Sequence, residues 1–426
     1  MNRRRSAFPQ RLILLGLLAL TLIVIPAATA QTFTVLHTFS GPDGANPGAG
    51  LTLDRAGNLY GTTKYGGNTG GSCPPLGCGS VFKLAHAGSG WVLSPLYKFD
   101  AGAGDGTEPQ ARAVFGPDGT LYGTASCCSG GTVYNLRPPA NRCSSTSCPW
   151  TETILLHFDF FNGGIPIGDL SFYAGDIYGT TPLGGHNLGC GRLGGCGEVF
   201  VLTPSGNSWT ENVIFGFFGS LGESPNSGVI LDAAGNVYGT VPEDSDQAFG
   251  LVFQLTPAGS SWNFSTAYHF QNTTDGRQPW GGLIFDDAGN LYGTTTYGGA
   301  NSGGTVFQLT PSGGGWTFNL IYALPGGNGS HGPEAKLARD SAGNLYGTTV
   351  KDGAYGYGTV FKLTPTDGGW TYTSLHDFTG GRDGANPYGA IALDANGNLY
   401  GTTLIGGNMN SNCQAGSCGV VFEITQ

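Results

Sequence analysis

Charge is scarce in this chain, and so are long apolar runs. Only 11% of its 426 residues are charged, whereas 77 are glycine. Such a composition leaves little material for the solvated faces of helices and favours many short strands joined by tight turns. The one long apolar run covers residues 12–25. It is shorter than the ~20 residues that a helix needs to cross a bilayer.

Residues 1–30 have the pattern of a signal peptide. Arg3, Arg4 and Arg5 precede the apolar run, and Ala28-Thr29-Ala30 matches the small-residue pattern that signal peptidase cleaves. We expect cleavage near Ala30, which leaves a mature domain of residues 31–426 with no second apolar segment. The mature protein is therefore expected to be secreted, extracellular or periplasmic, without membrane insertion.

Basic residues become scarcer still once the leader is removed. The leader takes four arginines with it, which leaves 14 Lys and Arg against 28 Asp and Glu. An acidic balance of this size argues against nucleic acid and anionic membranes as partners. A glycan or an extracellular protein is the expected partner, and the protein is expected to be a monomer.

All ten cysteines have another cysteine close to them in sequence. The gaps are unlike the C-x2-C pairs with nearby histidines of zinc sites. In an exported protein they favour local disulfides that stiffen single loops. The expected disulfides are Cys73–Cys78, Cys127–Cys128, Cys143–Cys148, Cys190–Cys196 and Cys413–Cys418.

One phrase, GNLYGTT or a close variant, occurs seven times at intervals of 54 to 62 residues. Its tyrosines are Tyr60, Tyr122, Tyr178, Tyr238, Tyr292, Tyr346 and Tyr400. A period in this range, with four strand-like segments in each unit, is typical of β-propeller blades. The glycine after each tyrosine removes a side chain, and we expect this to let neighbouring blades pack closely.

One unit shows the four expected strands, which we name A to D from the channel outward. They cover Gly282–Asp286, Leu291–Thr296, Thr305–Thr310 and Trp316–Leu324, and they are bounded by Gly, Pro, Asn and Asp. The sequence therefore predicts an all-β, seven-bladed propeller of four-stranded blades. The expected blades cover about 48–99, 110–161, 166–217, 226–270, 280–324, 334–378, and 388–426 together with 32–39.

The ends of the mature chain predict how the ring closes. Thr32–Phe39 matches a fourth strand, and Val420–Thr425 matches a third strand. The N-terminal strand is therefore expected to complete the last blade, which leaves no unfinished sheet edge between the termini.

The unit D-x-x-G-N-L-Y-G-T-T, followed by G-x-V-F-x-L-T-P and a strand with tryptophan, resembles the Gloeobacter–Verrucomicrobium (GloVer) tandem repeat. The likeness covers residues 32–426 and implies an exported bacterial protein. A C-terminal sorting anchor is common in that family, but none is expected here, so surface attachment is not expected either. The D-x-x-G-N-L-Y part resembles, more loosely, the blades of NHL and gluconolactonase-type propellers. The GloVer resemblance implies no catalytic residues.

The connections from strand D to strand A carry a repeated aspartate, at Asp43, Asp105, Asp275 and Asp383. Carboxylates on one face of a propeller can bind calcium. The alternative is that each aspartate caps a turn, ahead of a glycine and a rigid proline. Calcium is the only cofactor that the sequence suggests.

Other side chains on the same face are candidates for binding or chemistry. Trp280 and Tyr388 follow D–A prolines, and Tyr65 and Tyr297 follow second strands, so these aromatic rings could stack on sugars or pack between blades. Arg112, Asp169 and Lys336 interrupt a run of Gly and Ala at the start of strand A. They are candidates for chemistry at the channel mouth, or simply for solvent contact.

Two functions remain open at this point. No H-E-x-x-H, G-x-S-x-G or phosphate-loop motif is present, which favours a binding or structural module for glycans or protein partners. The alternative is a carbohydrate-active hydrolase, lyase or lactonase with its site at the channel mouth, because propellers host many unrelated functions.

Overall fold

The computed structural model describes residues 31–426, apart from 71–72, 74, 89, 105, 127–129, 140–149, 186–194, 244–248, 328–330 and 409–412. Residues 31–426 form one compact unit. Some predicted features lie outside the described residues: the leader, Asp105, Cys127, Cys128, Cys143, Cys148 and Cys190.

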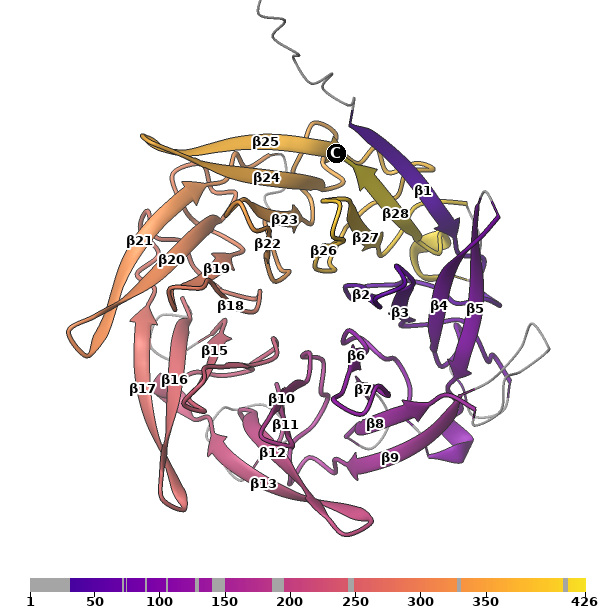
Figure 1. The fold of residues 1–426 in the computed structure, drawn as a ribbon, viewed down its shortest axis with the longest axis horizontal. Coiled ribbons are helices and arrows are strands. Elements are labelled where there is room, and N and C mark those ends of the chain that lie inside the picture. Colours follow the sequence, from indigo (N-terminus) through magenta and orange to yellow (C-terminus); the bar gives the residue numbers. More distant parts are fainter. Residues whose placement is uncertain are drawn as a thin grey trace, which may run out of the picture. The chain divides into compact units, whose positions relative to one another are not determined.

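Seven four-stranded antiparallel sheets form a ring, and each sheet runs from strand A inside to strand D outside (Figure 1). The predicted all-β, seven-bladed propeller is confirmed. The described loops contain three short 3-10 helices, namely η1 (Ala101–Ala103), η2 (Gly219–Leu221) and η3 (Gln414–Gly416). Among the described residues, no helix is long and apolar enough to cross a membrane.

The strands of the seven blades are as follows. Blade 1 comprises β2 (Thr52–Leu53), β3 (Leu59–Thr63), β4 (Ser80–Ala87) and β5 (Gly90–Lys98). Blade 2 comprises β6 (Val114–Phe115), β7 (Leu121–Ala125), β8 (Thr132–Arg137) and β9 (Thr151–His157). Blade 3 comprises β10 (Ser171–Tyr173), β11 (Asp176–Thr181), β12 (Glu198–Ser205) and β13 (Ser208–Gly216). Blade 4 comprises β14 (Ile230–Leu231), β15 (Val237–Val241), β16 (Leu251–Ala258) and β17 (Ser261–His269). Blade 5 comprises β18 (Ile284–Phe285), β19 (Leu291–Thr295), β20 (Thr305–Ser312) and β21 (Gly315–Ala323). Blade 6 comprises β22 (Ala338–Arg339), β23 (Leu345–Thr349), β24 (Thr359–Thr366) and β25 (Gly369–Asp377). Blade 7 comprises β26 (Ala392–Leu393), β27 (Leu399–Thr403), β28 (Val420–Thr425) and β1 (Thr32–Thr38).

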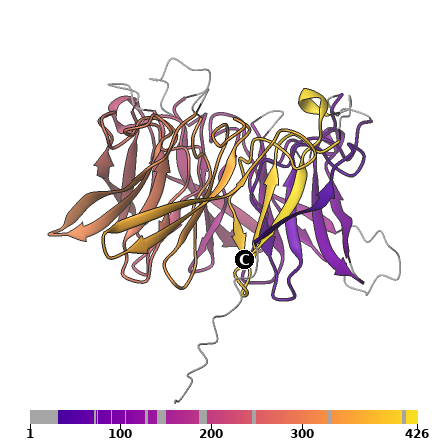
Figure 2. The same cartoon turned by 90° about the horizontal axis from the view of Figure 1, so that it is seen from above.

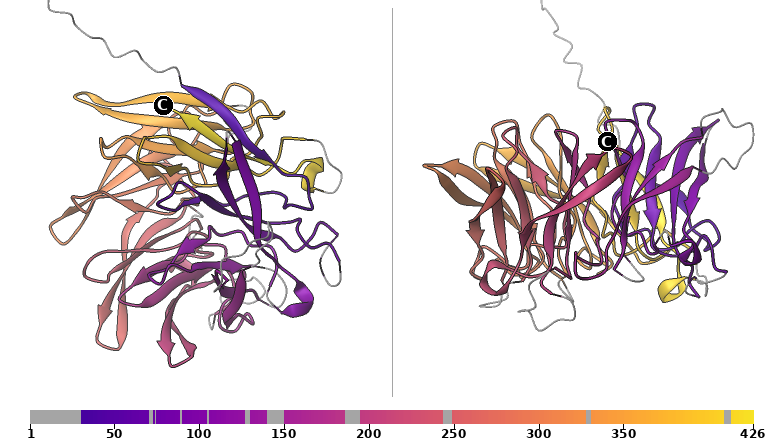
Figure 3. Two further views of the ribbon diagram at one scale, coloured as in Figure 1. Left: turned by 45° about the vertical axis from the view of Figure 1, so that its right-hand side comes forward. Right: turned by 90° about the horizontal axis from the view of Figure 1, so that it is seen from below.

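The N-terminal strand closes the ring, as predicted. β1 pairs antiparallel with β28, so the order in blade 7 is β26-β27-β28-β1, and Figure 3 shows the two strands side by side. The register runs from Thr32 opposite Thr425 to Thr38 opposite Val420, with one irregularity between Val35 and His37. Pairing the two ends of the chain covers the edge that β28 would otherwise expose.

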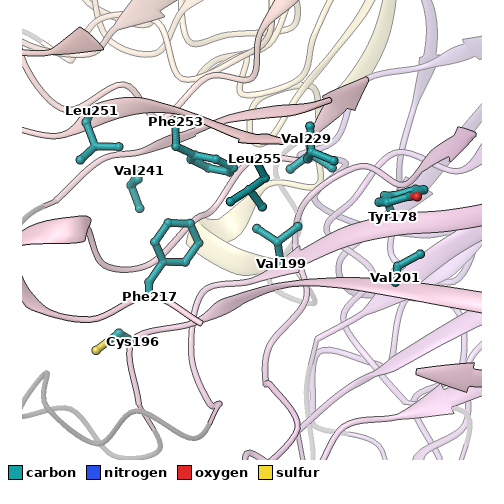
Figure 4. Close-up of a cluster of buried hydrophobic side chains, with 11 residues drawn as sticks. Tyr178, Cys196, Val199, Val201, Phe217, Val229, Val241, Leu251, Phe253 and Leu255 are labelled. Atoms are coloured by element: carbon teal, nitrogen blue, oxygen red, sulfur yellow. The ribbon is translucent and has the colours of Figure 1, made fainter. Parts of the chain in front are cut away.

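Apolar side chains between neighbouring sheets form the core. Figure 4 shows the cluster between blades 3 and 4, where Tyr178 and Val199 meet Val229, Phe253 and Leu255. Similar clusters join the other neighbouring blades. Each sheet therefore buries both faces, which explains why strands such as Leu291–Thr295 are buried at every residue.

The glycine after each repeated tyrosine makes room within its own blade, and not between blades as the sequence suggested. Gly293 on β19 lies opposite Phe307 on β20, and a Cβ atom at Gly293 would lie 2.5 Å from the Phe307 ring. The aromatic ring therefore lies over the glycine backbone of the neighbouring strand, a recognised way of covering a strand glycine.

Strand A is shorter than its sequence pattern indicates. The predicted strand Gly282–Asp286 forms only β18, at Ile284 and Phe285. The three residues that follow the D–A proline therefore stay outside the sheet in every blade and can line the channel.

Candidate functional site

Stacked rings of seven residues line one end of the central channel. The first ring, which we call the mouth ring, takes the residue that follows the D–A proline of each blade. Its members are Gly48, Gln110, Ile167, Asn226, Trp280, Glu334 and Tyr388. The second ring, the throat ring, lies two residues further along. Its members are Gly50, Arg112, Asp169, Gly228, Gly282, Lys336 and Ala390.

The residue before the D–A proline has an unusual backbone conformation in most blades. In six blades that residue is not glycine, yet it has a φ of 55 to 57°, in the left-handed region. These residues are Asn46, Glu108, Ile165, Ser224, Gln278 and Asn386. Such a conformation costs about 1–3 kcal/mol and persists only where the surroundings enforce it.

Part of that enforcement comes from the disulfide loops between strands B and C. The amide of Asn46 donates to the carbonyl of Cys418 at 2.7 Å, and that of Glu108 donates to the carbonyl of Cys78 at 2.9 Å. The disulfides Cys73–Cys78 and Cys413–Cys418 are confirmed. They stiffen loops that position the mouth ring of the next blade. Figure 2 shows η3, from one of these loops, on one face of the ring and the C-terminal end of β28 on the opposite face.

A third disulfide loop follows the same rule. Cys196 is also disulfide-bonded, although its expected partner Cys190 lies outside the described residues. Its carbonyl accepts the amide of Ser224, the residue before the proline of blade 4, at 2.9 Å.

The mouth ring surrounds a cavity of about 360 Å³. Trp280 and Tyr388, both half-buried, contribute its aromatic surface. Gln110 donates through Nε2 to Ser126, and Asn226 donates through Nδ2 to the carbonyl of Ser224. Within the part of the chain that the structure describes, neither amide oxygen has a partner, so both can accept hydrogen bonds from a ligand.

Glu334 is the acidic member of the mouth ring. Its Oε1 atom pairs with Nε2 of His331. Burial raises the pKa of Tyr388 to about 12, and the nearby Glu334 carboxylate and Tyr297 add to this rise. The Tyr388 hydroxyl therefore stays protonated at neutral pH and can donate a hydrogen bond.

Two of the four predicted aromatic binders lie elsewhere. Tyr65 packs against the core between blades 7 and 1, with the Lys64 ammonium 5.2 Å from its ring centre. The ring of Tyr297 lies 5.4 Å from the Arg277 guanidinium and 5.4 Å from the His331 ring. Neither lines the mouth cavity, whereas Trp280 and Tyr388 do.

The throat ring brings Arg112, Asp169 and Lys336 together around a cavity of about 170 Å³. Oδ2 of Asp169 accepts a hydrogen bond from Nε of Arg112 at 3.1 Å and forms an ion pair with one Nη, also at 3.1 Å. Oδ1 accepts the Arg112 amide at 3.0 Å. Both oxygens of Asp169 are therefore occupied, and this aspartate links blade 2 to blade 3.

Lys336 is the third charged member of the throat ring. Its aliphatic stem lies beside Gly282, where a Cβ atom would be 3.5 Å from Cδ of the lysine. Burial lowers the pKa of Lys336, and the neighbouring positive charge of Arg112 lowers it further, while Asp169 acts in the opposite direction. Its ammonium forms no hydrogen bond or ion pair with the described residues.

The repeated aspartates of the D–A connections hold turns. Asp43 and Asp383 pair with His37 and His376, at 2.9 and 3.1 Å. Asp275 accepts the Tyr268 hydroxyl at 3.0 Å, and all three aspartates also accept bonds from their own loops. Within the described ranges, no group of three or more His, Cys, Asp or Glu side chains is arranged to hold a metal ion.

Gln110, Asn226 and Glu334 were not singled out from the sequence. The position after the D–A proline differs in every blade, so no consensus existed for these residues to break. Aligning the seven D–A prolines would have found them, because this alignment places them in register with Trp280 and Tyr388.

Solved structures with similar folds share little sequence with this chain. A protein from Bacteroides uniformis assigned as a 6-phosphogluconolactonase is 14% identical, with a TM-score of 0.50 over 83% of this chain and 88% of that chain. The extracellular domain of a protein from B. thetaiotaomicron assigned as a hybrid two-component system is 13% identical, with a TM-score of 0.52 over 92% of this chain and 39% of that chain. At such identities the likeness shows the fold alone.

Sequence comparison gives the family. No curated protein matches the chain. A family model described as the Gloeobacter/Verrucomicrobia repeat matches residues 23–193, 129–331 and 188–422. The chain therefore belongs to the Gloeobacter/Verrucomicrobia repeat family.

Proposed function

We propose that this protein is an exported binding module that holds the end of a glycan chain in the mouth of its channel. The observation that carries the proposal is the mouth ring. The rest of the repeat places similar residues in every blade, whereas the mouth ring has seven different residues around one cavity. A ring of unlike side chains suits an asymmetric ligand of small size.

The chemistry of the mouth supports a sugar as that ligand. The C–H face of a sugar ring can stack on Trp280 or Tyr388, because aromatic rings offer large apolar surfaces. Sugar hydroxyls can donate to the oxygens of Gln110, Asn226 and Glu334. A cavity with apolar walls and a few placed polar groups is the usual form of a small-molecule site, and its volume of about 360 Å³ falls in the usual range.

The leader and the disulfides support export. Residues 1–30 have the order of a signal peptide, and disulfides persist in oxidising compartments. The protein is acidic and has few basic residues. It therefore suits an uncharged ligand, or one whose contacts are confined to the channel mouth, better than a long polyanion that would meet the acidic surface.

The test uses the mature protein, residues 31–426, with a panel of soluble and insoluble polysaccharides. Retention on a polymer, without release of new sugar ends, is the expected result. Trp280→Ala and Tyr388→Ala should each weaken binding by about 10- to 30-fold, the effect of removing a central aromatic contact. Tyr355→Ala is the matched control, because Tyr355 is an exposed tyrosine (61%) outside the mouth.

Binding that is unchanged in both mouth variants would contradict the site. Absence of retention on every polymer would remove the glycan proposal and direct the search to protein partners.

A second function, catalysis on a carbohydrate, is favoured by one observation. Burial lowers the pKa of Lys336, and a lysine with a lowered pKa is a better base or nucleophile than an exposed lysine. New sugar ends that disappear in Lys336→Met would identify a hydrolase, lyase or lactonase. Asp169→Ala would then also reduce the rate, by releasing Arg112 from its fixed orientation.

A further inference from the structure

We infer that the throat of the channel is an anion-binding subsite that takes the carboxylate of an acidic sugar residue, with Lys336 and Arg112 as its cationic groups. This inference rests on the proposed function, because the mouth would hold the ring that carries the carboxylate. It assigns the ligand of the mouth to one class of sugars, the sugar acids, which carry a negatively charged carboxylate.

The charges of the throat do not balance. Arg112 and Asp169 form an ion pair, while Lys336 adds a positive charge that no described side chain pairs with. The other four members of the ring are glycine or alanine and carry none. The throat ring therefore has a net positive charge, in a chain whose overall charge is −10. Glu334 of the mouth ring also lines this cavity, but its carboxylate pairs with His331.

Burying an ammonium group without a counter-charge costs free energy, and an anion that pairs with the group offsets this cost. The Lys336 side chain does not extend to the outer surface of the protein, as most lysines do, but lines the cavity. A ligand carboxylate would supply the missing charge and several hydrogen-bond acceptors.

Arg112 is oriented for the same role. Asp169 accepts hydrogen bonds from Nε and the backbone amide of Arg112 and forms an ion pair with one Nη, and these contacts fix the plane of the guanidinium. The second Nη has no partner within the described part of the chain. A planar guanidinium with a fixed orientation recognises carboxylates well.

The throat and the mouth share their walls, and this continuity favours a sugar acid over a free anion. Gln110, Asn226, Trp280, Glu334 and Tyr388 line both cavities. A sugar ring at the mouth could therefore direct one substituent inward to Lys336. A free anion would have to pass Glu334 and would gain nothing from the aromatic rings.

The first experiment measures the acylation rate of individual lysines in the mature protein by peptide mass spectrometry. Glucuronate, glucose and inorganic phosphate are the probes, because glucuronate differs from glucose by the carboxylate alone. Glucuronate should protect Lys336 more strongly than glucose or phosphate does. Lys351, which is exposed, is the internal control and should be unaffected.

The second experiment compares affinities in the variants by titration. Lys336→Met should weaken glucuronate binding by about 10- to 100-fold, the usual value of hydrogen bonds to a charged group, and should weaken glucose binding far less. Lys351→Met should behave as wild type. Arg112→Gln gives an independent reading of the same site if Lys336→Met does not fold, as checked by thermal unfolding.

The outcomes separate the inference from the proposed function. Equal protection by glucuronate and glucose, with Lys336→Met binding both as wild type does, overturns the anion subsite but leaves glycan binding intact. Protection by phosphate that equals protection by glucuronate overturns the assignment to a sugar acid. Absence of protection by any probe overturns the inference, whatever the polysaccharide panel shows.

Discussion

At the scale of single residues, Glu198 departs furthest from the repeat. It occupies the first position of a C strand, where other blades have Ser80, Thr132, Leu251, Thr305, Thr359 or Val420. Its side chain is fully buried, and neither carboxylate oxygen has a hydrogen-bond partner among the described residues. Burial raises the pKa of Glu198 to about 8, and the charge of Glu211 adds to the rise.

The pKa of Glu211 is also raised in the folded protein. Burial raises the pKa of Glu211 to about 7, although a hydrogen bond from Asn162 partly opposes this, and Asp159 adds to the rise. Both acids therefore have a higher pKa in the folded protein than in the unfolded chain, where it is 4.5. The folded state binds more protons between pH 4.5 and 8, so stability must fall as the pH rises through this range.

We predict that Glu198→Gln removes much of this loss. At pH 8 the variant should exceed wild type in its free energy of unfolding by about 1–3 kcal/mol, because it no longer carries a buried, unpaired charge. Near pH 4 the two proteins should differ little. Urea denaturation at a series of pH values measures both. Glu198→Thr, which installs the residue of blade 5, should give the same sign, and parallel pH profiles for variant and wild type would contradict the argument.

The sequence could identify only some residues of the candidate site, for a physical reason. Arg112, Asp169 and Lys336 stood out because they interrupt glycine and alanine, which close packing of neighbouring blades requires at most throat positions. A Cβ atom at Gly228 would lie 2.1 Å from the carbonyl oxygen of Asp169, for example. The mouth positions do not require a small residue, so each blade has a different side chain there. Gln110 and Asn226 therefore could not be recognised as exceptions to a repeated residue.

At the scale of the structural element, the turn between strands A and B is the most regular feature. Its sequence is Asp-x-x-Gly-Asn in most blades. In blade 5, Oδ1 of Asp286 accepts the amides of Ala288 and Asn290, and Oδ2 accepts Asn290 Nδ2 and the Tyr292 hydroxyl. Burial alone would raise the pKa of Asp286, but these hydrogen bonds together lower it. The repeated aspartate therefore joins the turn to the tyrosine of strand B.

We predict that Asp286→Ala destabilises the protein by about 1–3 kcal/mol, the usual cost of losing hydrogen bonds to a charged group. Thermal and urea unfolding give the magnitude. Hydrogen exchange should place the loss in blade 5, because each blade contacts mainly its neighbours. Asp287→Ala is the matched control, since the adjacent Asp287 side chain is fully exposed and its one ion pair, with Arg339, is of the surface kind that contributes little to stability. An equal effect of the two substitutions would show that the network contributes nothing.

Strand A shows why element lengths were harder to predict than element types. The apolar pattern of Gly282–Asp286 is that of a strand, yet only Ile284 and Phe285 pair with β19. The inner strands converge on the channel axis, and the segment after the proline follows the channel wall instead of the sheet. The length of strand A is therefore set by the geometry of the whole ring, and the sequence of residues 282–286 alone does not reveal it.

At the scale of the whole molecule, the fold was predictable for two reasons. The repeat recurs seven times at intervals of 54 to 62 residues, and one of its units is divided between the two ends of the mature chain. The chain begins with a fourth strand and ends with a third, an arrangement that is useful only if the ends meet. In the structure, Phe33 of β1 stacks on His376 of blade 6, with a centroid distance of 3.7 Å, and on Phe422 of β28 at 5.5 Å. The first strand thus joins blade 7 to its neighbour as well as completing it.

We predict that removing residues 31–38 opens the ring at this point. Without β1, the edge of β28 is exposed over residues 420–425 and becomes a template for pairing with another chain. The shortened protein should unfold at a lower temperature and self-associate, as measured by calorimetry and analytical ultracentrifugation. A synthetic peptide of residues 31–39 should restore both properties when added in excess, because a ligand that binds only the folded state stabilises it. The same peptide with Phe33→Asp should restore them less, since it lacks the ring that stacks on His376. A shortened protein that stays monomeric and as stable as wild type would mean that blades 1 and 7 hold together through their other contacts, such as the hydrogen bonds between Asn46 and the Cys413–Cys418 loop.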